Sequence, residues 1–324
     1  VVARLGSGKW VAIIGYGYNN THNSRGGLLV IDILNGGNVL WQIDLPGSVA
    51  TDNGLGQIEG WDANGDGNLD WVFAGDLHGN IWKFDLTVSD PQANGVAYGG
   101  QPLFQAKSSS GVKQPVTGGV SLAKHPKTGQ LWLYFGTGKL LSDADPINTE
   151  QQSWYGIIDG SPITDRNSQL IQRDMYNATN DERIIEDAPL DDMATKRGWV
   201  IDLNDTRERI VQKPQVRSVN LGASRGTALV VASQVPNSDF CNPASDGWVM
   251  AINPFTGGRL MVHYFDINKD GSYDSGDAVV DDDEVMLHSN TASASAGIRL
   301  LRLWRVAMRA IDDVRGAVRE SGEI

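Results

Sequence analysis

The sequence predicts an all-β protein, and three observations support this fold class. Glycine accounts for 38 of the 324 residues, well above the usual ~7%, and tight turns between strands use many glycines. Apolar and polar residues alternate in stretches such as Ile81–Phe84, as they do along a strand. Apolar residues at helical spacing are nearly absent before residue 290. We therefore expect strands joined by glycine-containing turns over most of the chain.

Five segments repeat one pattern, in which a turn leads into a strand that carries a tryptophan. They are Gly36–Asp44, His78–Asp85, Thr128–Phe135, Arg197–Asp202 and Asp246–Asn253. The tryptophans at 41, 82, 132, 199 and 248 are 41, 50, 67 and 49 residues apart, and three of these intervals are close to the ~40–50 residues of one propeller blade. The pattern predicts a β-propeller with a tryptophan in the core of each blade. We interpret the polar stretch Ser161–Asp192, within the longest interval, as an inserted loop.

The end of the chain does not follow this pattern. From about Ile298 onward, apolar residues recur at three- and four-residue spacing, which predicts a helix; they are Leu300, Trp304, Ala307, Ile311, Val314 and Val318. We divide the chain into a propeller region, residues 1–284, and an atypical helical tail, residues 285–324. The tail, whose basic residues are all arginine, could pack on the domain, be unrelated to it, or lie on a membrane surface. We favour the first two.

Charge and cysteine content limit the class of protein. The net charge of −12 argues against nucleic acid and anionic membranes as partners of the main domain, and it suits a protein that binds cations. The single cysteine, Cys241, rules out an intrachain disulfide without excluding an extracytoplasmic location. No signal peptide or apolar run of transmembrane length is present, and the chain starts directly at Val1–Arg4. We therefore interpret it as a fragment whose targeting signal, if any, lies upstream, and whose propeller ring is incomplete.

The segment Asp62–Asp70 is the most informative stretch of the chain. Oxygen-bearing side chains stand at loop positions 1, 3, 5 and 9 (Asp62, Asn64, Asp66 and Asp70), and Gly67 stands at position 6. Alternate side chains of such a loop turn toward one centre, where Ca²⁺ can take six or more oxygens. Without a cation the converging carboxylates would repel one another. We expect calcium here, followed by a strand rather than an EF-hand helix; the alternative is a metal-free turn rich in Asp and Asn.

A second segment, Asp266–Asp277, repeats this arrangement. Its oxygen ligands are Asp266, Asn268, Asp270, Asp274 and Asp277, with Gly271 at position 6 and Ser272 offering its carbonyl at position 7. The closing residue is Asp rather than the usual bidentate Glu, so its reach is shorter and we expect weaker binding. The acidic run Asp281–Glu284 would raise the local cation concentration or form a solvated turn.

No motif predicts a catalytic site. Gly222–Gly226 matches the G-x-S-x-G pattern of a nucleophile elbow, but a strand-like run follows it where that motif needs a helix. The five histidines lack the spacing of zinc ligands. We therefore expect no enzyme activity from these residues.

Taken together, these features resemble the C-terminal β-propeller of the PilY/PilC family, the tip-associated adhesins and assembly factors of bacterial type IV pili. The resemblance extends from about Trp10 to Glu284. Its most specific block is the first loop continuing through Phe73–Leu86. Four further blocks follow in order: Tyr134–Leu141, Gln152–Asp159, Arg197–Leu203 and Thr256–Leu260.

The resemblance implies a modified, quinoprotein-like propeller in a non-enzymatic protein of the pilus tip, outer membrane or cell surface. It implies roles in pilus biogenesis, adhesion and twitching motility, with pilin or minor pilins as partners and an unidentified host or surface ligand. In the family the propeller calcium site controls pilus extension and retraction. Carried over to this chain, the ligands are the side chains of Asp62, Asn64, Asp66 and Asp70 and the main-chain carbonyl of Asn68. The family's variable N-terminal portion is absent, and the tail after Glu284 does not continue its final blade.

Two other functions remain open at this point. A quinoprotein dehydrogenase would share the Gly-x-x-Trp-x-Phe-Asp appearance of Gly79–Asp85, but such enzymes often carry a vicinal cysteine pair, and Cys241 is alone. A carbohydrate-binding propeller would use the calcium loops and surface tryptophans to hold a glycan.

Overall fold

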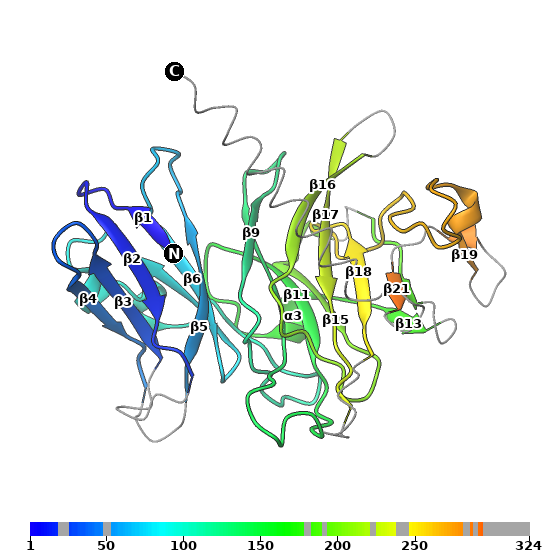
Figure 1. Cartoon of the computed structure of the whole chain (residues 1–324), viewed down its shortest axis with the longest axis horizontal. Coiled ribbons are helices and arrows are strands. Elements are labelled where there is room, and N and C mark those ends of the chain that lie inside the picture. The colour runs from blue at the N-terminus through cyan, green and yellow to red at the C-terminus, as the bar shows by residue number, and fades with distance from the viewer. Residues whose placement is uncertain are drawn as a thin grey trace.

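In a computed structural model, the described residues of the chain form four main β-sheets that stand side by side in a row (Figure 1). The structure describes residues 1–18, 26–47, 53–177, 183–189, 193–220, 225–237, 246–280, 286–287 and 291–293. Its helices are short: α1 (Pro91–Asn94), α2 (Ala97–Gly100), α3 (Arg166–Gln169) and the 3-10 turn η2 (Ser275–Asp277). Within these described ranges, no helix has the length and apolar character needed to cross a membrane.

The first two sheets, called blade 1 and blade 2, are simple antiparallel meanders. Blade 1 has the order β1 (Val2–Arg4), β2 (Trp10–Gly15), β3 (Gly27–Asp32) and β4 (Asn38–Asp44). Blade 2 has the order β5 (Leu55–Trp61), β6 (Trp71–Asp76), β7 (Asn80–Asp85) and β8 (Phe104–Gln105). Neighbouring strands are also consecutive in sequence, as antiparallel pairing allows. The connection from β7 to β8 is longer than a turn and contains α1 and α2.

The next two sheets, blade 3 and blade 4, carry additions. Blade 3 has the order β12 (Ile171–Arg173), β15 (Gly198–Asp202), β11 (Ser153–Ile158), β10 (Leu131–Gly136) and β9 (Ser121–Lys124). Blade 4 has the order β16 (Gln215–Asn220), β17 (Arg225–Ala232), β18 (Trp248–Ile252) and β21 (Thr291–Ser293). Two separate hairpins pair β13 (Met175–Asn177) with β14 (Arg183–Ile185), and β19 (Val279–Val280) with β20 (Met286–Leu287).

The cores lie between the blades, so a central strand is buried on both faces. In β6, Val72 and Ala74 belong to the cluster shared with blade 1, while Phe73 belongs to the cluster shared with blade 3. In β10, Leu133 faces blade 2 and Trp132 faces blade 4 in the same way. This face-to-face packing explains why β6, β10 and β11 read as continuous apolar runs rather than alternating ones.

Blade 1 also has an apolar face that no described residue covers. Trp10 and Ile14 of β2 are each 46% exposed, and Val39 of β4 is 55% exposed. Blades 1 and 4 lie at opposite ends of the row in Figure 1, so the sheets do not close into a ring. Because the propeller is incomplete, this face of blade 1 packs against no other blade in the described part of the chain.

The predicted fold class, all-β with an incomplete propeller, is confirmed, and each of the five tryptophan segments contains a strand: β4, β7, β10, β15 and β18. These strands occupy different places in their sheets, and two of them, β10 and β15, belong to the same blade, so the segments do not mark one blade each. Trp82, Trp132, Trp199 and Trp248 are buried as expected, whereas Trp41 is only partly buried.

Two details differ from the sequence-based expectations. The stretch Ser161–Asp192 is not only a loop, because it supplies α3, the parallel edge strand β12 and the β13–β14 hairpin. Lys83, the polar member of the alternating run, is buried with its apolar neighbours and pairs with Asp159 at 2.7 Å. The expected helix at 298–318, the acidic run 281–284 and Cys241 lie outside the described residues.

Candidate metal sites

The first candidate loop, residues 62–70, connects β5 to β6 at one end of blade 2. Trp61 and Trp71 pair across the hairpin, and the amide of Asp70 donates to the carbonyl of Trp61 at 3.1 Å. The amide of Leu69 donates to the carbonyl of Arg4 in blade 1 at 2.7 Å, and the Leu69 side chain is buried in the core between the two blades. The loop is therefore attached firmly to the core at its end, while residues 64–67 are exposed.

Asp62, at position 1, organises the turn by accepting two backbone hydrogen bonds. Its carboxylate oxygens accept from the amides of Gly65 at 2.6 Å and Gly67 at 2.7 Å. Both glycines have left-handed backbone angles, with φ of +80° and +82°. Side chains with a Cβ rarely adopt this conformation, so the glycines allow the chain to wrap around the carboxylate.

The next candidate ligands continue the turn. The Asn64 side-chain oxygen accepts from the amide of Asp66, and the Asp66 carboxylate accepts from the amide of Asn68, each at 2.8 Å. These contacts lower the pKa of Asp66 below its ordinary value, with the backbone amide of Asn68 as the main cause and the Asn68 side-chain amide next. Asp66 thus remains ionised and available to a cation at neutral pH.

Asp70 closes the first loop. Its carboxylate accepts from the amide of Ala63 at 2.9 Å, its side chain is nearly buried, and its own carbonyl accepts from the amide of Leu86 at 2.9 Å. The Asp70 carboxylate therefore ties position 9 back to position 2.

The second loop, within the segment between β18 and β19, forms a similar turn in which the first carboxylate accepts from positions 5 and 6 rather than 4 and 6. Asp266 accepts from the amides of Asp270 at 3.1 Å and Gly271 at 3.0 Å. The left-handed positions are again 4 and 6, with φ of +63° at Lys269 and +91° at Gly271. Position 4 is thus filled by a lysine in a conformation that favours glycine.

Positions 3 and 5 of the second loop also match the first. The Asn268 oxygen accepts from the amide of Asp270 at 3.0 Å, and the Asp270 carboxylate accepts from the amide of Ser272 at 2.7 Å. The pKa of Asp270 is lowered, mainly by the Ser272 amide and then by the Asn268 side chain. The two loops therefore share geometry and electrostatics at these positions.

The second loop closes differently. Asp277 at position 12 is 1% exposed, and its carboxylate accepts from the amides of Ile267 at 2.6 Å, Asn268 at 3.2 Å and Asp274 at 3.2 Å. Asp274 at position 9 instead accepts from the amide of Gly276 at 2.8 Å. The tie to position 2 that Asp70 makes in the first loop is made here by Asp277.

The predicted residues of each loop are thus joined in one hydrogen-bonded turn. The first turn lies in blade 2, and the second lies in the connection that follows β18 of blade 4. Across the described part of the chain, no three His, Cys, Asp or Glu side chains converge closely enough to hold a metal ion. The oxygen donors nevertheless suit a hard cation, which would draw the carboxylates inward. The Asn68 side-chain oxygen is buried and accepts no hydrogen bond from any described residue, so it is open to a cation. From the sequence, only the main-chain carbonyl of Asn68 was predicted as a metal ligand. The side-chain oxygen of Asn68 was not considered.

A buried carboxylate beyond the loop explains the most specific sequence block. Asp76, at the end of β6, is fully buried and accepts hydrogen bonds at 2.8–2.9 Å from the amides of His78 and Asn80 and the side chains of Asn53, Asn80 and Trp82. It therefore fixes the β6–β7 turn. In the described contacts, Asp76 has a structural role. The sequence feature that could have predicted this role is its position just before the turn residues His78–Gly79.

Two buried ion pairs were also not predictable from the sequence. Asp159, which follows β11, accepts from Lys83 at 2.7 Å and from the Tyr98 hydroxyl at 2.5 Å, linking blade 3 to blade 2. In the inserted stretch, Arg183 makes a bidentate pair with Glu208 at 2.7 and 3.0 Å, and both side chains are fully buried. Neither pair has a local sequence signal, because the partners are 76 and 25 residues apart.

Comparison with known proteins agrees with this architecture. A sequence profile of the PilY1 β-propeller domain matches residues 1–176. The chain belongs to the PilY1 β-propeller family. The crystal structure of the Pseudomonas aeruginosa PilY1 C-terminal domain superposes with a TM-score of 0.72 at 28% identity, covering 91% of this chain and 66% of that one. The family predicted from the sequence blocks is thereby confirmed.

Curated relatives are similar over most of this chain. A type IV pilus biogenesis factor PilY1 homolog of Xylella fastidiosa is 34% identical over 277 residues, covering 84% of this chain and 21% of that protein. The type IV pilus biogenesis factor PilY1 of Pseudomonas aeruginosa strain UCBPP-PA14 is 30% identical over 324 residues, covering 85% of this chain and 28% of that protein. The chain therefore spans only about a fifth to a quarter of the length of these relatives.

Proposed function

We propose that this chain is the propeller domain of an extracytoplasmic, non-enzymatic protein of the pilus tip that is needed for type IV pilus biogenesis. The observation that carries the proposal is its similarity to the PilY1 C-terminal domain over 91% of the chain. The curated relatives are named as type IV pilus biogenesis factors. The partners of this domain would be pilin or minor pilins. The protein would also contribute to adhesion and twitching motility.

We further propose that both loops bind Ca²⁺ and that the first one controls pilus extension and retraction. In the first loop the ligands would be Asp62, Asn64, Asp66, Asn68 and Asp70; in the second they would be Asp266, Asn268, Asp270, Ser272, Asp274 and Asp277. A bound cation supplies positive charge that offsets repulsion among the carboxylates. The loop residues would then hold one conformation at the end of the β5–β6 hairpin, and a surface formed by that end would change its affinity for a partner.

Calorimetric titration of Ca²⁺ into the purified chain tests this proposal, beside Asp70→Ala, Asp274→Ala and the double variant. We expect two binding events, of which each single substitution removes one and the double variant loses both. Thermal unfolding should shift in parallel, because a ligand at 100 times its Kd adds about 2.7 kcal/mol of stability. Asp143→Ala is a matched control, since Asp143 is exposed and lies outside both loops.

A folded chain that binds no Ca²⁺ would remove the calcium part of the proposal. The pilus part is tested separately, in cells of the source bacterium that express the full-length protein with Asp70→Ala. Piliation and twitching should change in this strain and stay normal with Asp143→Ala. Normal piliation after deletion of the whole gene would overturn the proposed role in biogenesis.

A further inference from the structure

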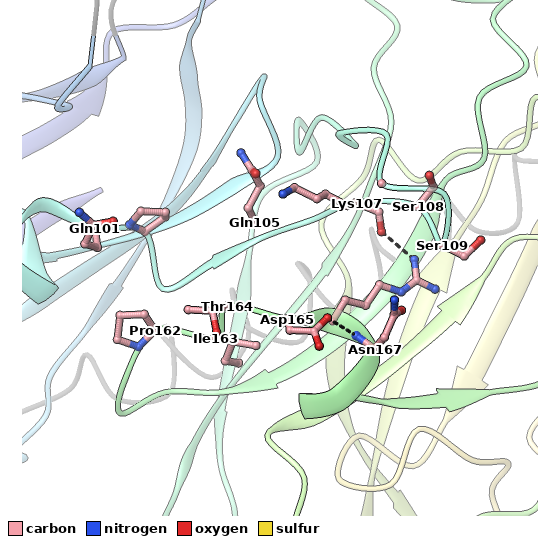
Figure 2. Close-up of a pocket in the computed structure, with 13 residues that line it drawn as sticks. Gln101, Gln105, Lys107, Ser108, Ser109, Pro162, Ile163, Thr164, Asp165 and Asn167 are labelled. Carbon is pink, nitrogen blue, oxygen red and sulfur yellow. Dashed lines mark hydrogen bonds between the residues drawn. The ribbon is translucent and has the colours of Figure 1, made fainter.

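A polar pocket lies between blades 2 and 3, away from both candidate loops. Its volume is about 420 Å³, within the range of small-molecule sites. One wall is the segment around β8 and the loop after it, with Gln105, Lys107 and Ser109 (Figure 2). The opposite wall is the segment that leads into α3, with Thr164, Asp165 and Asn167.

The two walls are held in place by one buried arginine. The Arg166 guanidinium donates to the Lys107 carbonyl at 2.7 Å, to Gln172 at 2.8 Å and to Asp202 at 2.6 Å. The Tyr155 hydroxyl donates to the same Lys107 carbonyl at 2.8 Å. These bonds fix the loop of blade 2 against blade 3, so a ligand would not have to order the walls when it binds.

The side chains that face the pocket have unused hydrogen-bonding capacity. Within the described part of the chain, no hydrogen bond or ion pair involves the side chains of Lys107, Gln101, Ser109 or Asn167. Figure 2 shows the Lys107 side chain extending from its wall toward Gln105. A ligand would thus meet an ammonium group, two amides and a hydroxyl, which together donate and accept.

The charges of the pocket are separated. The charge of Arg166 is matched by Asp202, with 2.6 Å between the paired atoms, whereas Lys107 forms no ion pair with any described residue. On the other wall, the Asp165 carboxylate accepts from the Ser168 hydroxyl at 2.6 Å and the Asn167 amide at 3.0 Å, and these bonds lower its pKa. A fitting ligand therefore carries an anionic group at one end and hydroxyl donors at the other.

We propose that this pocket binds an acidic sugar, with the carboxylate of the sugar on Lys107 and its hydroxyls on Asp165, Asn167 and Gln101. Hydroxyl groups both donate and accept, as this lining requires. The rings of Pro102 and Pro162 offer a small apolar surface for the C–H face of the sugar. Most pockets for organic ligands are lined mainly by hydrophobic and aromatic side chains. The many polar side chains of this pocket therefore favour a ligand rich in hydroxyl groups.

The test is a titration of the purified chain with glucuronate, N-acetylneuraminate, glucose and acetate, followed by ligand-observed NMR in buffer with EDTA. We expect at least one acidic sugar to bind at least tenfold more tightly than glucose and acetate, since a charge-assisted bond adds to the hydroxyl contacts. Lys107→Gln should remove that advantage, and Asn167→Ala should weaken binding of the same sugar. Lys113→Gln, an exposed lysine on the same loop and outside the pocket lining, should change nothing.

Two results would overturn the proposal. Acetate binding as tightly as the best acidic sugar would show a simple anion site, and equal binding of that sugar to the Lys107→Gln variant would place the sugar elsewhere. Neither result depends on Ca²⁺ or on pilus assembly, so this inference and the proposed function can fail independently.

Discussion

The two candidate loops have similar turns and different attachments, and position 8 shows the difference most clearly. Leu69 fills this position in the first loop and is 7% exposed, whereas Tyr273 fills it in the second and is 65% exposed. The first loop joins two paired strands of blade 2, and the second closes on itself through Asp277. The spacing of Asp, Asn and Gly therefore encodes the local turn, while the surrounding blade decides how firmly the turn is held.

The largest expected effect is on this attachment. Leu69→Ala should destabilise the calcium-free chain by about 3 kcal/mol, because it removes buried methyl groups and leaves a cavity between blades 1 and 2. Tyr273→Ala should change stability by less than about 0.5 kcal/mol, as exposed substitutions usually do. Urea unfolding of both variants measures the contrast. Equal losses at the two positions would contradict the difference in attachment.

A smaller effect is expected at position 4, where the two loops differ in residue and share a left-handed backbone. Gly65→Ala should cost about 1 kcal/mol, since a Cβ at φ of +80° is strained although no neighbouring atom lies within 4 Å. Lys269→Gly should relieve the same strain and raise the stability of the second loop by up to about 1 kcal/mol.

Amide hydrogen exchange within each loop is the appropriate measurement, because the strain is local. Gly65→Asn serves as the milder control, since Asn tolerates the left-handed region better than Ala. A loop that exchanges more slowly with Gly65→Ala, or faster with Lys269→Gly, would refute the strain argument.

The smallest effect concerns pH. Because the pKa of Asp66 and of Asp270 is lowered in the folded chain from 3.8, each contributes stability that is present above pH 3.8. That contribution is lost as pH falls through the lower folded pKa. Carbon-13 NMR of the carboxyl groups in calcium-free buffer should show both titrating below 3.8, and Asp66→Asn identifies one of the two signals. Titration of either group at or above 3.8 would disagree with the hydrogen bonds from Asn68 and Ser272.

The strands were predictable where a short pattern determines them. All five tryptophan segments contain strands, because a turn followed by β-branched and aromatic residues favours an extended chain on its own. Their places in the sheets were not predictable: the tryptophan strand is fourth in blade 1 and third in blade 2. The order of strands in a sheet depends on pairing between distant segments. The sequence of one strand says little about which other strand pairs with it.

The inserted stretch and the buried polar groups mark the limit of sequence reasoning. Ser161–Asp192 is polar enough to resemble a loop, yet Arg183 within it is completely buried because Glu208 and Asp205 neutralise it. Lys83, the polar residue of the alternating run Ile81–Phe84, is likewise buried because it pairs with Asp159. From sequence alone, a charged side chain is expected at the surface unless an oppositely charged partner can be identified. Here the partners lie in other blades or loops, so the sequence does not identify them.

By itself, the sequence determined the fold class, the family blocks and the two Asp-rich turns, because each depends on residues within a dozen positions of one another. The hydrogen bonds of Asp62 to Gly65 and Gly67 are of this local kind. Only the tertiary structure decided that Leu69 anchors one turn while Asp277 closes the other. It alone brought Lys107 and Asp165 to opposite walls of one pocket. Such contacts arise when sheets pack face to face, which brings together residues whose distance along the chain carries no signal.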